Sequence, residues 1–320
     1  MADEFETIAK LLRPLTRGAP EALDLLDDAA VLPSRPGFDL VLTKDAMVEG
    51  VHFLPTDPLD LVARKLLRTN LSDLAAKGAE PFGYLLATAW RESDGWAERE
   101  AFAKGLAEDG EAFDLRLLGG DTVSTSGPLL VSATLLGWVP SGGMIRRDGA
   151  KAGDLVLVTG HIGDGWLSLQ AALGRVGDPE GELLERYRLP QPRVGMRRAL
   201  NLANAAADIS DGLLADVGHV ARASGLKAVV DLQCIPRSLI GGVWSDGKVE
   251  RLLALATGGD DYELVCAVSP ENLQAFGDLT GDIPFAVVGH FEAGEGVEAR
   301  FFGDVVPVER PGWRHGGFED

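Results

Sequence analysis

The sequence predicts an α/β protein with two domains. Its 320 residues are enough for two domains of ordinary size, each with its own hydrophobic core. Segments with helical apolar spacing alternate with short strand-like apolar runs in both halves of the chain. The run Pro140-Ser141-Gly142-Gly143 interrupts this alternation. We therefore expect a first domain over residues 1–145 and a second over residues 146–320.

The first half contains three predicted helices and four predicted strands. Residues 5–17 have the apolar spacing of an amphipathic helix. Asp57-Pro58 marks the start of the next helix, with an aspartate N-cap and proline at the first helical position, and this helix should run to about Ala76. A third helix is expected over residues 98–112. The predicted strands cover residues 39–43, 82–89, 114–118 and 129–139.

The second half repeats the alternation. The clearest helix covers residues 210–224, with Leu213 and Val217 on its apolar face and Gly225 at its end. Another helix should follow the turn Gly160-His161-Ile162-Gly163. The predicted strands cover residues 154–159, 227–232, 262–268 and 285–289.

Composition narrows the class of protein. The net charge of −19 argues against nucleic acid or an anionic membrane as the main partner. No apolar stretch reaches the roughly 18 residues needed to cross a bilayer, and the acidic N-terminus lacks the apolar core of a signal peptide. The two cysteines, Cys234 and Cys266, lie in strand-like runs without a CxxC pair, so we expect core residues of a cytoplasmic protein.

Aspartates at the ends of short apolar runs are the main functional signal. An apolar run that stops at a carboxylate beside Gly, Ser or Thr is typical of a strand that delivers an oxygen ligand to a loop. Turn formation or helix capping explains any one of these sites equally well. Six such sites together favour a centre for Mg²⁺ ions. The runs end at Asp27-Asp28, Asp45, Asp73, Asp121, Asp208-Ile209-Ser210-Asp211 and Asp260-Asp261.

The usual phosphate-binding motifs are absent from the sequence. Gly247-Lys248 is followed by Val249 rather than Ser or Thr, so the chain has no Walker-A motif, and the protein-kinase motifs are missing too. Gly160-x-x-Gly163 can present backbone N–H groups to an anion, although tight packing in a turn explains it as well. If the protein uses ATP, metal-binding aspartates must replace the P-loop.

Three further residues have both a functional and a structural interpretation. Arg147, at the expected domain boundary, could grip a phosphate with its guanidinium group or be a plain surface arginine. His52 follows the strand that contains Asp45 and could reach the same cleft, although a single histidine is usually structural. Trp313 could stack on a flat ligand or anchor the C-terminal segment against the core.

Taken in chain order, the aspartate-containing segments and their neighbours resemble those of the thiamine-monophosphate kinases. This family belongs to a superfamily with aminoimidazole-ribonucleotide synthetase and selenophosphate synthetase. The resemblance runs from Asp27-Asp28-Ala29-Ala30 to Gly312-Trp313. The most specific stretches are Glu49-Gly50-Val51-His52-Phe53, Asn70-Leu71-Ser72-Asp73, Gly119-Gly120-Asp121-Thr122, Asp208-Ile209-Ser210-Asp211-Gly212 and Gly259-Asp260-Asp261-Tyr262-Glu263.

The resemblance implies a PurM-like two-domain fold in which the N-terminal strands of two subunits close a barrel, and hence a homodimer. It implies phosphorylation of thiamine monophosphate to thiamine diphosphate by ATP, with Mg²⁺ as cofactor and with Asp211 and Arg147 at the reacting groups. The implied Mg²⁺ ligands are Asp27, Asp28, Asp45, Asp73, Asp121 and Asp211. The implied ATP contacts are Thr43, Gly120, Asp121, Thr122, Arg147 and Ser210. The implied substrate contacts are His52, Asp261 and Trp313.

The sequence departs from the family pattern at Leu26, at Lys44 and at His315-Gly316-Gly317-Phe318. One alternative is another ATP-dependent synthetase of the superfamily. Selenophosphate synthetase needs a reactive cysteine or selenocysteine near the N-terminus, whereas the first cysteine here is Cys234. The other alternative is a non-catalytic, acidic protein that binds metal or nucleotide. For the kinase we expect direct in-line transfer without a general base, because the phosphate nucleophile is already ionised at neutral pH.

Overall fold

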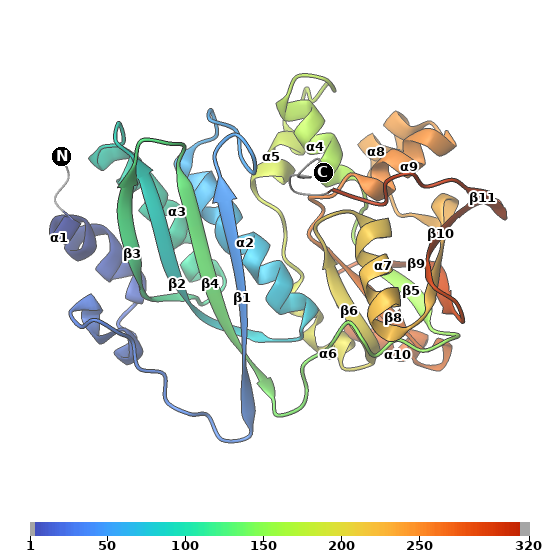
Figure 1. The fold of residues 1–320 in the computed structure, drawn as a ribbon, viewed down its shortest axis with the longest axis horizontal. Helices are drawn as coiled ribbons and strands as arrows, with labels where there is room; N and C mark the ends of the chain where they lie inside the picture. Colours follow the sequence, from blue (N-terminus) through green and yellow to red (C-terminus); the bar gives the residue numbers. More distant parts are fainter. Residues whose placement is uncertain (1–3, 314–320) are drawn as a thin grey trace, which may run out of the picture. The chain divides into compact units, whose positions relative to one another are not determined.

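The computed structural model describes residues 4–313, which fold into two compact units (Figure 1). The first unit holds the residues up to 74 and residues 79–142, and the second holds residues 75–78 and those from 143 onward. Each unit combines one β-sheet with helices, so the predicted α/β class with two parts is confirmed.

The first unit is built on a four-stranded sheet in the order β1-β4-β2-β3. The strands β2 and β3 are parallel, and the other neighbours are antiparallel. The helices α2 and α3 cover one face of this sheet (Figure 1), where Tyr84, Leu86 and Trp90 are buried. The elements are β1 (Phe38–Val48), α2 (Leu59–Ala76), β2 (Glu80–Arg91), α3 (Trp96–Ala112), β3 (Arg116–Thr125) and β4 (Leu130–Pro140).

Two strands of this sheet extend well beyond their predicted ends. The strand β1 continues to Val48 and β3 continues to Thr125, so Asp45 and Asp121 lie inside strands and the predicted strand ends at these residues were wrong. The physical reason is that β-favouring residues follow both aspartates, Val48 in one strand and Thr122 and Val123 in the other.

The N-terminal helix predicted over residues 5–17 is irregular. It consists of α1 (Glu4–Thr7), a π-helical turn (Ile8–Leu12) and a 3₁₀ turn (Arg13–Thr16). Pro14 lies at the start of the 3₁₀ turn, where its ring cannot continue regular α-helical hydrogen bonding. A second 3₁₀ segment (Pro20–Leu25) leads to Asp27 and Asp28.

The second unit is built on a seven-stranded sheet in the order β11-β10-β7-β9-β5-β8-β6. Its strands are β5 (Leu155–Thr159), β6 (Ala203–Ile209), β7 (Lys227–Asp231), β8 (Glu263–Val268), β9 (Phe285–Glu292), β10 (Gly296–Phe301) and β11 (Asp304–Val306). Its helices are α4 (Asp164–Ala172), α5 (Glu182–Arg188), α6 (Arg197–Leu200), α7 (Leu213–Ser224), α8 (Leu239–Ser245), α9 (Val249–Thr257) and α10 (Leu273–Leu279).

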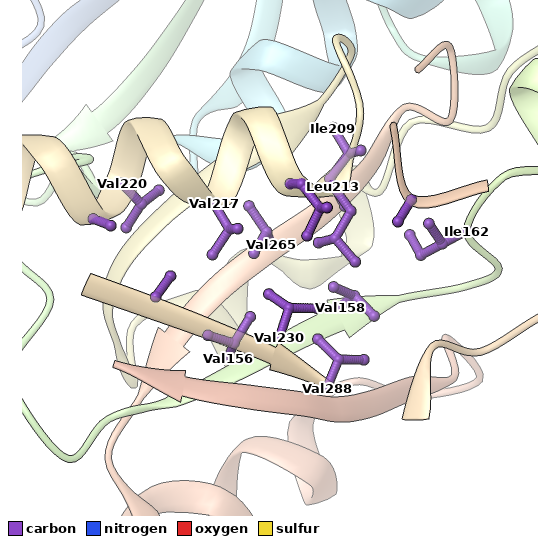
Figure 2. Close-up of a cluster of buried hydrophobic side chains, with 14 of the residues drawn as sticks. Val156, Val158, Ile162, Ile209, Leu213, Val217, Val220, Val230, Val265 and Val288 are labelled. Atoms are coloured by element: carbon purple, nitrogen blue, oxygen red, sulfur yellow. The ribbon is translucent and has the colours of Figure 1, made fainter. Parts of the chain in front are cut away.

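The main core of the second unit lies between α7 and the sheet. Figure 2 shows Leu213 and Val217 of α7 directed at Val156, Val230 and Val265 of the strands, and these side chains are fully buried. The apolar face predicted for α7 is thus the face that packs on the sheet. This packing fixes the N-terminal end of α7, next to Asp211, against the end of β6.

The two cysteines have different environments. Cys266 is buried in β8, as predicted. Cys234 is exposed, which corrects the prediction of a core residue, because β7 ends at Asp231 and Cys234 lies in the 3₁₀ turn that follows. The described residues form no helix of the length and apolarity that a membrane span requires.

The contact between α2 and α3 gives a first stability prediction. A Cβ added at Gly105 of α3 would lie 2.0 Å from the backbone oxygen of Asp60 in α2. We expect Gly105→Ala to lower the free energy of unfolding by about 1–3 kcal/mol, because the backbone of α2 must shift.

Gly110→Ala on the same helix is the matched control, since the nearest atom to its Cβ is 3.4 Å away. It should instead stabilise the protein by about 0.5–1 kcal/mol through helix propensity. Urea unfolding of both variants measures the difference, and an equal effect would contradict this account of the helix contact.

Candidate active site

Asp45 and Asp73 form a first acidic group between β1 and α2. Alternation along β1 directs Thr43 and Asp45 towards α2, where Thr43 Oγ1 donates a 2.5 Å hydrogen bond to Asp73 Oδ2. The backbone N–H of Asp45 donates to Asn70 Oδ1, 3.1 Å away, and Asn70 is fully buried. Burial, and then the charge of Asp73, raise the pKa of Asp45 to about 6.

Lys44 does not neutralise this acidic group. As the neighbour of Asp45 in β1, it points to the opposite face of the sheet. There its Nζ donates to Ser132 Oγ, 2.9 Å away, and Ser132 Oγ in turn donates to the backbone oxygen of Asp45. Lys44 departs from the family pattern, but its charge lies on the open face of the sheet. It therefore adds no positive charge to the face that carries Asp45.

Asp27, Asp28 and Asp121 form a second acidic group at the other edge of the sheet. All three line a cavity of about 600 Å³ in the first unit. Gly120 is required beside Asp121, because a Cβ there would lie 1.9 Å from the backbone oxygen of Leu86 in the adjacent strand. The exposed Leu26 precedes this pair of aspartates.

Within one copy of the chain, Asp45 and Asp121 lie too far apart to bind the same ion. The residues that align across the sheet with Asp45 are Ala133, Leu86 and Gly120, so three strand spacings, about 14 Å, separate β1 from β3. Asp121 is the neighbour of Gly120 and points to the opposite face of the sheet. Asp45 and Asp121 therefore do not converge within the first unit.

Asp211 belongs to a third group, in the second unit, together with Asp216 and His219. Their potential ligand atoms all lie within 4.8 Å of one another. The turn before α7 needs Gly212, whose φ is 121°. Asp216 Oδ2 fixes this turn by accepting hydrogen bonds from the backbone N–H groups of Ser210, Asp211 and Gly212 at 3.0, 3.0 and 3.2 Å. Sequence reasoning missed Asp216 and His219, although their spacing of one helical turn is a detectable signal.

Arg147 lies close enough to this group to affect its protonation. Burial, and then the charge of Asp211, raise the pKa of Asp216 to about 7, and the charge of Arg147 acts against this. Burial, and then the charges of Arg147 and Arg222, lower the pKa of His219. The structure thus brings Arg147 and Asp211, the two residues expected at the reacting groups, into one cluster.

Trp313 borders the same cluster. Its backbone N–H donates to the backbone oxygen of Asp211 at 2.9 Å, and its side chain is 55% exposed. The close approach needs Gly312, because a Cβ there would lie 2.4 Å from that oxygen. Trp313, Asp211 and His219 line a cleft of about 380 Å³. The departure at residues 315–318 lies outside the described residues.

The remaining predicted substrate residues, His52 and Asp261, are held by backbone groups. His52 Nδ1 accepts from the backbone N–H of Val48 at 3.0 Å, so Nε2 carries the proton of the neutral ring. Asp261 is buried and accepts from the backbone N–H groups of Gly163 and Gly165 at 2.9 Å. The sequence predicted that the turn Gly160–Gly163 could present N–H groups to an anion. In the structure the anion that accepts from Gly163 is the carboxylate of Asp261.

Asp261 gives a prediction for pH dependence. Burial raises the pKa of Asp261 to about 8, although the two backbone N–H groups act against this. Between pH 4 and 8 the folded state therefore binds more protons at this group than the unfolded state, and stability falls as pH rises. We expect the unfolding free energy of the natural protein to fall, relative to that of Asp261→Asn, by about 1–3 kcal/mol between pH 5 and pH 8. Urea unfolding across this range measures the difference, which stays constant if Asp261 is charged throughout.

Comparison with known proteins places the chain in a family. Residues 26–139 match the family described as AIR synthase related protein, N-terminal domain, and residues 151–301 match its C-terminal domain. A thiamine-monophosphate kinase of Caulobacter vibrioides is 59% identical over 319 residues, which cover 98% of this chain and 91% of that protein. The chain belongs to the thiamine-monophosphate kinase family.

Solved structures of the family share the fold. A thiamine-monophosphate kinase from Stenotrophomonas maltophilia has a TM-score of 0.80 and 35% identity, over 88% of this chain and 91% of that one. A structure described as AaThiL complexed with AMPPCP and TMP has a TM-score of 0.78 and 29% identity, over 89% of each chain. The PurM-like two-domain fold implied by the sequence resemblance is thereby confirmed.

Proposed function

We propose that the protein transfers the γ-phosphoryl group of ATP to thiamine monophosphate and so forms thiamine diphosphate. The observation that supports this most strongly is the 59% identity to a thiamine-monophosphate kinase over 98% of the chain. Such near-complete coverage favours the kinase over another synthetase of the superfamily. The three acidic groups support it independently, because the phosphate groups of the two substrates repel each other and need cations to approach. Because ATP is a cytoplasmic co-substrate, we place the reaction in the cytoplasm.

We propose Mg²⁺ as the cofactor. Asp45 and Asp73 fit a cation, since the charge of Asp73 raises the pKa of Asp45 while Thr43 and Asn70 hold the two residues in place. Hard carboxylate oxygens beside a phosphate substrate are the ligands that Mg²⁺ prefers. We assign Asp27, Asp28, Asp45, Asp73, Asp121 and Asp211 as the residues that would hold it. When bound, Mg²⁺ supplies positive charge that offsets the negative charge of the transferred phosphoryl group.

We propose that the working unit is a homodimer with a site shared between its copies. The face of the first sheet that α2 and α3 leave open exposes Leu42, Leu85 and Val123. Its edge strands, β1 and β3, each have one neighbour among the described strands. A barrel closed by two copies would cover the apolar face and place β1 of one copy beside β3 of the other. The strand that carries Asp45 of one copy would then lie beside the strand that carries Asp121 of the other.

We assign the cleft beside Trp313 to thiamine monophosphate. The thiazolium ring of thiamine is a flat cation, and the exposed indole of Trp313 next to Asp211 offers both a π face and a negative charge. The guanidinium group of Arg147 can grip a phosphate with two parallel hydrogen bonds. We also assign His52 to the substrate, and Asp261 holds the turn at Gly163 that precedes α4.

The chain needs no catalytic base for this reaction. The nucleophile is a phosphate oxygen whose second pKa is about 6, so it is ionised at neutral pH. The residues of the chain therefore have to orient the two substrates in line rather than supply a base. We expect direct transfer, in which no labelled protein accumulates during turnover with γ-labelled ATP.

The experiment that tests this function is incubation of the purified protein with Mg²⁺, ATP and thiamine monophosphate, followed by ³¹P NMR. The kinase produces new diphosphate resonances at the expense of ATP and the monophosphate. A protein that only binds nucleotide or metal leaves the spectrum unchanged, and that result would contradict the proposal.

A further inference from the structure

The segment that carries Arg147 is fixed to the second unit on two sides. On one side it follows the edge strand β6, where the backbone N–H of Ala206 donates to the backbone oxygen of Arg146 at 3.1 Å. Gly149 approaches the same strand so closely that an added Cβ would lie 2.0 Å from the backbone oxygen of Asn204. The backbone before and after Arg147 is therefore held against β6.

Ser224, the last residue of α7, holds the segment on the other side. Its Oγ donates to the backbone oxygen of Arg147 at 3.1 Å and accepts from the backbone N–H of Ala150 at 3.2 Å. One hydroxyl group thus bridges two points of the segment. Because both partners are backbone groups, this bridge sets where the main chain of Arg147 lies relative to α7.

The first turn of α7 holds the residues that the side chain of Arg147 approaches. Asp216, in this turn, fixes the backbone N–H of Asp211. Ser224 and His219 are five positions apart, a rise of about 7.5 Å along the helix, which an extended arginine side chain spans. In agreement, the guanidinium charge of Arg147 affects the pKa of Asp216 and of His219. The helix thus holds Asp211 at one end and the backbone of Arg147 at the other.

We propose that Ser224 is a positioning residue for phosphoryl transfer, which holds the backbone of Arg147 so that its guanidinium group meets a substrate phosphate beside Asp211. The inference rests on the proposed function, in which Arg147 contacts a phosphate. A guanidinium group forms two parallel hydrogen bonds to a phosphate only in a narrow range of orientations, so a small shift of its backbone is costly. Ser224 acts through Arg147, since both of its hydrogen bonds are made to that segment.

A double-mutant cycle of Ser224 and Arg147 tests this role. We expect Ser224→Ala to lower kcat for thiamine diphosphate formation about three- to tenfold, which is the net contribution of one hydrogen bond. Ser224→Thr keeps the hydroxyl group and should recover most of the activity. In the Arg147→Met background, Ser224→Ala should change kcat by less than about twofold, because the side chain that it positions is gone. Losses that multiply in the double variant would overturn the inference.

Thr280→Ala is the matched control. Thr280 also places a hydroxyl group at the end of a helix of the second unit, where its Oγ1 donates to the backbone oxygen of Gly277 in α10 at 3.1 Å. This variant should keep kcat within about twofold of the natural value. If it loses as much activity as Ser224→Ala, the loss is a general effect of helix-end hydroxyl groups and the role of Ser224 is refuted.

Calorimetry with Mg²⁺-ATP separates this inference from the proposed function, because binding needs no turnover. Arg147→Met and Ser224→Ala should each weaken ATP binding, and Ser224→Ala should have no further effect when Arg147→Met is present. A natural protein that shows this pattern but makes no thiamine diphosphate refutes the proposed function alone. A natural protein that makes thiamine diphosphate, while Ser224→Ala keeps the natural kcat and ATP affinity, refutes the role of Ser224 alone.

Discussion

Asp45→Asn and Asp121→Asn each lower kcat for thiamine diphosphate formation by about 10²–10³-fold, the loss expected when one preorganised electrostatic group is removed. Each substitution keeps the shape of the side chain and removes a negative charge that would hold Mg²⁺. The fold should be unaffected, because the backbone of Asp45 makes the hydrogen bonds to Asn70 and Ser132 in either case. Steady-state kinetics with saturating Mg²⁺-ATP measures the loss.

The matched control for these variants is Asp39→Asn. Asp39 lies on the same strand as Asp45, is exposed, and accepts from Ser141 Oγ and the backbone N–H of Gly142. This variant should retain near-natural activity. If Asp45→Asn and Asp121→Asn are as active as Asp39→Asn, neither aspartate is a metal ligand and the assignment of the acidic groups is wrong.

Arg147→Met is the second large effect, and we expect kcat to fall by about 10²–10³-fold. Arg147 is exposed, and its charge reaches Asp216 and His219 beside Asp211, so it is placed to contact a phosphate group. Arg147→Lys keeps the charge but loses the two-pronged geometry, and should recover only part of the activity.

The neighbouring residue provides a strict control for Arg147. Arg146 Nε and Nη2 donate to the two carboxylate oxygens of Asp148 at 2.8 and 2.6 Å, so this guanidinium group is already engaged. Arg146→Met should therefore leave kcat within about twofold of the natural value, as for most surface substitutions. Equal losses in the two variants would show a general effect of charge near this loop rather than a phosphate contact at Arg147.

Local signals in the sequence predicted most of the elements. The Asp57-Pro58 pair and the apolar spacing of α7 located two helices to within a few residues, because helix-start signals and amphipathicity are encoded nearby in the chain. Prediction failed at Pro14, where the N-terminal helix changes to a 3₁₀ turn, and at Cys234, which is exposed in the 3₁₀ turn after β7. In both places the backbone departs from the pattern that the apolar residues alone indicate.

The candidate site was only partly predictable for a physical reason. Each aspartate could be found from its neighbours, but the separation of Asp45 from Asp121 depends on the strand order β1-β4-β2-β3, which nonlocal pairing sets. The role of Asp216 likewise appears only when the turn at Gly212 folds back towards its carboxylate. Sequence reasoning thus identified acidic residues that belong to three separate groups.

The central claim is that phosphoryl transfer needs aspartates from two copies of the chain, and mixing two inactive variants tests it directly. Asp45→Asn and Asp121→Asn are each purified, unfolded together in equal amounts and refolded, and thiamine diphosphate formation is measured. Random pairing makes half of the dimers mixed, and each mixed dimer has one intact site of two, so about a quarter of the natural activity should return. If the mixture stays as inactive as its components, the site is not shared between copies and the account is contradicted.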